Sequence, residues 1–115
     1  MSRLAEPAYW RARALRALGD EDGATALLRK LLRSARARAS EPQRIDYFAT
    51  SLPTFLIFDD DLDRRNRIDC RYLESLALAG LGRSRAAVRG LREVLGQDVD
   101  HLRAAWHLRA LANRD

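Results

Sequence analysis

The chain has 115 residues and a net charge of +5, and its length suffices for one domain with a single modest core. Nineteen alanines, nineteen leucines and twenty arginines dominate the composition, and these strong helix formers favour an all-α protein. No apolar run approaches the roughly 20 residues of a membrane span, and the lone Cys70 excludes an internal disulfide, so the cytoplasm is the expected location.

A first pair of helices is predicted within residues 7–39. Pro7 suits the first turn of a helix, apolar residues then recur at helical spacing, and Gly19 ends the helix. A second helix begins near Glu21 and stops before Pro42. Its apolar residues form one stripe, typical of a buried face: Ala24, Leu27, Leu28, Leu31 and Leu32.

Residues 43–61 depart from this pattern and predict an inserted helical segment. A short amphipathic helix should end or kink at Pro53, because proline lacks a backbone donor and restricts the residue before it. The apolar stretch Thr54–Phe58 predicts a buried helical turn. We expect Asp59–Asp61 to end that turn and to cap the next helix.

The rest of the chain predicts three further helices, which brings the expected total to about six. A long helix over residues 62–81 is followed by Gly82 and by a helix over residues 84–95, so that residues 62–96 form a second pair. A last helix lies within residues 98–113, and Asp98 or Asp100 should cap it.

The two pairs are copies of each other. Tyr9–Leu32 aligns without a gap to Tyr72–Leu95, with identity at nine of 24 positions. The identical pairs include Tyr9/Tyr72, Leu18/Leu81, Gly19/Gly82, Ala24/Ala87, Leu28/Leu91 and Leu32/Leu95. An internal repeat of this kind predicts two similar helical hairpins joined by glycine-containing turns.

The repeated unit resembles the tetratricopeptide repeat. Small residues stand where its two helices would cross, as at Ala12 and Ser75, and large apolar residues follow. Residues 98–113 resemble the first helix of a third repeat, with Val99 where proline is usual. The resemblance implies a helical solenoid that acts as a non-enzymatic protein-interaction or scaffolding module, with a protein or peptide as partner.

The spacing of the copies differs from that of a regular tetratricopeptide array. Gly19 and Gly82 are 63 residues apart, which exceeds the 34-residue period by 29. With its insertion, the chain is similar to the helical C-terminal region of large bacterial proteins of unknown function that begin with a mutarotase-like β domain. That likeness implies a fragment of a longer protein. It also implies an alternative role, as a structural or dimerising domain of a larger, carbohydrate-active enzyme.

Tetratricopeptide arrays bind partners along a concave face that their first helices line. Alignment of the three units predicts that this face carries three aromatic residues in register, with charged and apolar neighbours. The candidate residues are Tyr9, Arg13, Arg16, Asp69, Tyr72, Leu76, Arg103 and Trp106. Alternatively, the aromatic residues form the core between repeats, as aromatic stripes at helical spacing commonly do.

A basic helix face is predicted from Arg29, Arg33 and Arg36, with Lys30 and Arg38 nearby. Such a face could neutralise phosphates. However, no aromatic residues interleave with it and no nucleic-acid motif accompanies it, so a solvated face is favoured and no nucleic-acid partner is expected. Both ends of the repeat array are incompletely covered, which makes a homodimer through the terminal helix a further expectation.

The remaining polar clusters predict no catalytic, cofactor or metal site. The run Asp59–Asp61 with Asp63 lacks the glycine and the distal glutamate of an EF-hand, so helix capping is favoured over cation binding. Cys70, His101 and His107 lack a metal-ligand spacing. Cys70 is most simply a small buried residue, since no base is paired with it in the sequence.

Overall fold

The computed structural model describes residues 4–41 and 55–113, and for residues 55–61 it describes the backbone alone. The described residues form five α-helices and no strand, which confirms the all-α prediction. The helices are α1 (Glu6–Ala17), α2 (Glu21–Ala39), α3 (Phe55–Gly80), α4 (Ser84–Gln97) and α5 (Leu102–Ala112). The short amphipathic helix predicted before Pro53 lies outside the described residues.

The predicted break at Asp59–Asp61 is wrong. Helix α3 runs without interruption for 26 residues from Phe55, so it joins part of the predicted insertion to the predicted second repeat. An aspartate inside a helix costs less than about 1 kcal/mol, which is a weak signal. Residues 59–61 fall in the second turn of α3, near the positive end of the helix dipole, where negative charge is tolerated.

The two hairpins α1–α2 and α3–α4 turn in the same way. Gly19 and Gly82 adopt positive φ values of 90° and 84°, the left-handed conformation that glycine allows without strain. Asp20 N donates to Leu15 O at 2.9 Å, and Arg83 N donates to Leu78 O at 2.9 Å, 63 residues further along. The internal repeat seen in the sequence is therefore a repeat of structure.

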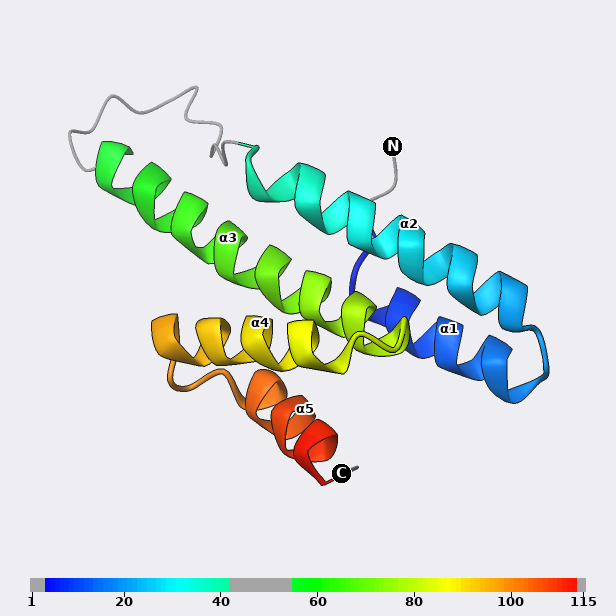
Figure 1. Cartoon of the computed structure of the whole chain (residues 1–115). Coiled ribbons are helices and arrows are strands. Elements are labelled where there is room, and N and C mark those ends of the chain that lie inside the picture. Colours follow the sequence, from blue (N-terminus) through cyan, green and yellow to red (C-terminus); the bar gives the residue numbers. More distant parts are fainter. Residues whose placement is uncertain (1–3, 42–54, 114–115) are drawn as a thin grey trace.

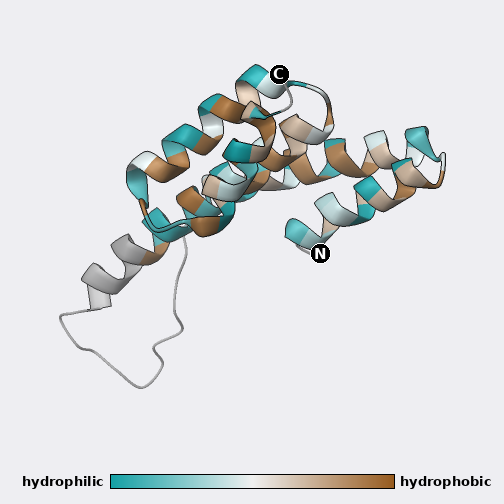
Figure 2. Ribbon diagram, turned by 90° about the horizontal axis from the view of Figure 1, so that it is seen from below, coloured by the Kyte–Doolittle hydropathy of each residue, from teal (hydrophilic) through white to brown (hydrophobic). Residues whose placement is uncertain are grey.

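Helix α3 lies between α2 and α4, and α5 lies on the far side of α4 (Figure 1). Helix α3 packs against α1, α2 and α4, and α5 packs against α4. Hydrophobic residues gather on the inner faces of the helices and hydrophilic residues on the outer faces (Figure 2). The largest fully buried hydrophobic side chains are those of Leu28, Leu31, Cys70, Tyr72, Leu76, Leu91 and Val94.

Helices α3 and α4 are in close contact at Ser75 and Gly90. Ser75 is fully buried, and its hydroxyl donates to Arg71 O of the preceding turn at 2.8 Å. A Cβ atom added to Gly90 would overlap the Ser75 Oγ atom. The small residue predicted at this crossing is therefore present on both helices.

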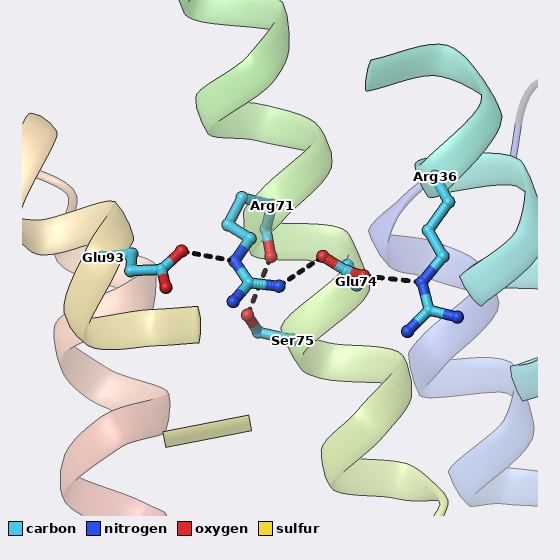
Figure 3. Close-up of polar contacts among 5 residues, drawn as sticks. All are labelled: Arg36, Arg71, Glu74, Ser75 and Glu93. Atoms are coloured by element: carbon cyan, nitrogen blue, oxygen red, sulfur yellow. Dashed lines mark hydrogen bonds and ion pairs between the residues drawn. The ribbon is translucent and has the colours of Figure 1, made fainter. Parts of the chain in front are cut away.

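A row of alternating charges joins α2, α3 and α4 (Figure 3). Arg36 of α2 donates to Glu74 of α3 at 2.7 Å, Arg71 donates to Glu74, and Arg71 also donates to Glu93 of α4 at 2.8 Å. Burial of Glu74 opposes its ionisation, but hydrogen bonds from Arg36 and Arg71 outweigh that cost and lower its pKa. The two arginines and two glutamates have no net charge together, and their hydrogen bonds link α2 to α3 and α3 to α4.

Two of the five residues of the basic face predicted on α2 contact residues outside that helix. Arg36 is paired with Glu74, and Arg38 donates to Leu4 O at 2.6 Å and lies 3.7 Å from Asp69. The other three basic residues of that face are exposed and make no ion pair with the described residues: Arg29, Lys30 and Arg33. The predicted solvated face therefore covers only the middle of α2, over residues 29–33.

Candidate partner-binding surface

Glu6 connects the first and last helices of the array. Its carboxylate accepts a hydrogen bond from Trp10 Nε1 at 3.1 Å, one turn along α1, and another from the Arg103 guanidinium of α5 at 3.2 Å. The Glu6 side chain is only 19% exposed, so its ion pair with Arg103 is partly shielded from water. Residues 97 positions apart thus meet at one surface.

The ring of His107 lies among four aromatic rings. Its centroid is 4.8 Å from that of Trp106, 5.6 Å from Tyr9, 5.8 Å from Trp10 and 6.0 Å from Tyr72. The side chain is buried, and burial lowers the pKa of His107 from its ordinary value of 6.5. The Glu6 carboxylate opposes this shift and the Arg13 guanidinium adds to it.

Acidification should therefore destabilise the fold through His107. As the pH falls below about 6.5, the unfolded chain takes up a proton that the folded chain does not, so the free energy of unfolding falls by at most about 1.4 kcal/mol per pH unit. Chemical denaturation between about pH 7.5 and about pH 5.5 measures this slope.

The His107→Phe variant should lose most of that slope, because it keeps an aromatic ring and cannot titrate. His101→Asn is the matched control: it removes the only other histidine, keeps an acceptor to cap α5, and should retain the slope. An unchanged slope in His107→Phe would show that other groups titrate in this range.

Two tryptophans cover the outer side of this cluster. Trp10 is 41% exposed and Trp106 is 56% exposed, and their ring centroids are 6.3 Å apart. The Arg13 guanidinium lies 5.2 Å from the Trp10 ring centroid, within the range of a cation–π contact. We call the four residues Trp10, Arg13, Arg103 and Trp106 the tryptophan surface.

Five of the eight residues predicted for the concave face meet here. Arg13, Arg103 and Trp106 belong to the tryptophan surface, and Tyr9 and Tyr72 are buried beneath it. The burial of these two tyrosines favours the core alternative for them. The aromatic residues predicted to act in register therefore divide between core and surface.

The other three predicted residues lie elsewhere. The Arg16 guanidinium donates to Gly80 O at 2.9 Å and pairs with Glu21 at 2.8 Å, which joins α1 to the end of α3. Asp69 lies beside Arg38 of α2, at 3.7 Å. Leu76 is fully buried. None of the three contributes an exposed contact to the tryptophan surface.

Sequence reasoning missed Glu6, Trp10 and His107. The pair Glu6 and Trp10 stands at a spacing of four, which places both side chains on one face of a helix. His107 stands between Ala104 and Leu111 at the spacing of a buried helical stripe, and all three are buried. The helical spacing of these three residues is therefore a sequence signal that places His107 in the core.

The Tyr72 hydroxyl is a buried polar group. Its oxygen has no partner within hydrogen-bonding distance among the residues that the structure describes. Burial, together with the nearby Glu6 carboxylate, raises the pKa of Tyr72. The centroid of the His101 ring lies 4.7 Å from that of Tyr72.

The predicted cap of the last helix by Asp98 or Asp100 is wrong. His101 caps α5, and its Nδ1 atom accepts a hydrogen bond from Ala104 N at 3.1 Å. Asp98 instead accepts from Asp100 N at 3.2 Å, within the preceding turn. Histidine is not among the preferred N-cap residues, so the sequence pattern favours the nearby aspartates over His101.

Cys70 is buried, and its pKa is raised chiefly by that burial, so the thiol stays protonated and is a poor nucleophile. Its sulfur lies 3.5 Å from Asn66 Oδ1. Within the part of the chain that the structure describes, no three His, Cys, Asp or Glu residues are placed to hold a metal ion. Among those same residues, no helix has the length and apolarity needed to cross a membrane.

Comparison with known proteins adds no assignment: no family model matches the chain, and no solved structure matches it either.

Proposed function

We propose that this chain is a non-enzymatic protein-interaction or scaffolding module of the tetratricopeptide type, and that it binds a protein or peptide through the tryptophan surface. The observation that carries the proposal is the exposed pair Trp10 and Trp106. Exposed tryptophans lose apolar surface to a partner on binding, and tryptophan and arginine are enriched among residues that dominate binding energy.

The chemistry of the surface indicates a partner segment with apolar and acidic groups. Arg13 has no carboxylate partner within the described residues. Its guanidinium lies against the Trp10 ring. Arg103 is paired with Glu6, but its own side chain is 73% exposed and can reach a second carboxylate. An aromatic or aliphatic side chain of the partner would pack on the indole rings while its acidic groups pair with the two arginines.

The surface is also supported from below. His107 contacts both indole rings and Tyr9 contacts that of Trp10, so little side-chain freedom remains to be lost when a partner binds. Glu6 fixes Trp10 through its indole nitrogen. Helical-repeat scaffolds bind partners with rigid surfaces of this kind, whose side chains are ordered before the partner arrives.

A peptide-display selection against the immobilised protein tests the proposal. We expect enriched peptides to combine an aromatic or aliphatic residue with acidic residues. Their Kd should rise at least about tenfold in the Trp106→Ala and Trp10→Ala variants, as for residues that dominate an interface. Isothermal titration calorimetry with the selected peptides gives the Kd values.

Leu18→Ala is the matched control, because Leu18 is 84% exposed and lies in the α1–α2 turn, outside the tryptophan surface. It should leave the Kd unchanged. Selected peptides that bind the tryptophan variants and the wild-type protein equally well would contradict the proposal.

One observation favours a second function, that of a structural or dimerising domain of a larger enzyme. Leu102 is 80% exposed and lies one turn from Trp106 on α5, so the two form an apolar strip on the terminal helix. Such a strip could pack against another domain or a second copy. A wild-type dimer in sedimentation that Trp106→Ala converts to a monomer would favour this second function.

A further inference from the structure

A second surface, separate from the tryptophan surface, lies between α4 and α5. A groove of about 630 Å³ runs along the two helices. Its floor is apolar, made by Val88 of α4 with Leu108 and Leu111 of α5. Its rim is basic: Arg85, Arg89 and Arg92 follow the same side of α4 as Val88, at helical spacing.

The three rim arginines lack an ion-pair partner among the residues that the structure describes. Other arginines in the same array are neutralised by carboxylates, as Arg71 is by Glu74 and Glu93. Arg85, Arg89 and Arg92 are exposed and make no ion pair with the described residues. Three unpaired positive charges beside an apolar floor are complementary to an acidic, amphipathic segment.

The groove belongs to the last two helices of the described chain. All of its lining residues lie on α4 or α5, and no other described helix contributes to it. Apolar grooves of this kind accept the apolar face of an amphipathic helix.

We propose that this groove binds an acidic amphipathic helix of a partner protein. Apolar side chains of that helix, spaced three and four residues apart, would fill the floor over Val88, Leu108 and Leu111. Glutamates or aspartates along its edge would pair with the rim arginines, as Glu93 of α4 pairs with Arg71 of α3. None of the described residues that line the groove is aromatic, so these residues offer no stacking platform for nucleic-acid bases.

A synthetic helical peptide provides the probe. It carries leucines at helical spacing on one face and glutamates on both edges, and a scrambled peptide of the same composition and charge is measured beside it. We expect saturable binding of the helical peptide in fluorescence anisotropy, with slower amide exchange in α4 and α5. The triple variant Arg85→Gln/Arg89→Gln/Arg92→Gln should weaken binding at least about tenfold.

The matched control removes the same number of charges elsewhere. Arg29→Gln/Lys30→Gln/Arg33→Gln changes three exposed, unpaired basic residues on α2 and should alter the Kd by less than about threefold. Circular dichroism checks that both triple variants fold, and the single variant Arg89→Glu replaces the first triple variant if it does not. Its binding should weaken in the same direction.

Several results would overturn the proposal. Equal losses in the two triple variants, or equal binding of the scrambled peptide, would indicate general attraction to a basic protein. No saturable binding of the helical peptide would show that the groove does not accept a helix. Tighter, groove-dependent binding of a random DNA duplex would assign the rim to phosphates, and a dimer lost in the rim variant would assign it to a second copy.

Discussion

The Tyr72→Ala variant should lose about 3–5 kcal/mol of its free energy of unfolding, as other buried aromatic residues do when truncated. Tyr72 is 2% exposed and contacts the rings of His101 and His107. Its removal opens a cavity where α3 meets α5, which surrounding side chains fill only in part. Urea denaturation followed by circular dichroism at neutral pH measures the loss.

Tyr72→Phe is the control that separates the ring from the hydroxyl. The hydroxyl has no hydrogen-bond partner among the described residues, so its deletion should change the free energy of unfolding by less than about 1 kcal/mol, in the stabilising direction. A large loss in Tyr72→Phe would reveal a hydrogen bond from the hydroxyl to the Glu6 carboxylate, which contributes to the raised pKa of Tyr72. An intact fold in Tyr72→Ala with lost peptide binding would return Tyr72 to the partner-binding surface.

The Gly90→Val variant should lose about 3 kcal/mol, because α3 and α4 cannot keep their present distance once a side chain stands at this position. The first added carbon would already overlap the Ser75 hydroxyl, and Arg71 lies just beyond it. Relief requires the two helices to separate or Ser75 to move, and both disturb the hydrogen bond from Ser75 to Arg71 O. Thermal and urea denaturation measure the effect.

Gly96→Val is the matched control in the same helix. Apart from its chain neighbours and the adjacent backbone of α4, no described atom lies within 4 Å of the position that a Gly96 Cβ would take, so this substitution should be nearly neutral. Gly90→Val in a Ser75→Ala background should recover part of the loss, since the overlapping oxygen is gone. If both glycine variants lose the same stability, the cause is the residue's effect on the helix and not the helix crossing.

The hairpins were predictable because their determinants are local. Gly19 and Gly82 stand where a left-handed residue ends a helix, and both adopt positive φ. The start of α2 at Glu21 follows from Asp20, whose side chain accepts from Gly23 N at 2.9 Å. The stripe through Leu28 and Leu31 follows from helical period, and both residues are buried.

Local sequence does not predict which residues meet at the tryptophan surface. Arg103 reaches Glu6 across 97 residues, and nothing in either local sequence indicates that contact. Alignment placed Trp106 with Tyr9 and Tyr72, yet its neighbour His107 enters the cluster while Trp106 stays exposed. The rotation of a helix about its own axis is set by what it packs against, and one residue of difference turns a side chain by about 100°.

The contact between α1 and α5 has a consequence for cooperativity. Linear arrays of helical hairpins are held by nearest neighbours, so their ends can fray while the middle stays folded. Here the first helix is joined to the last by Glu6 and Arg103 and by the rings around His107. Neither terminal helix can detach without breaking contacts of the other, which favours unfolding of the five helices as a single unit.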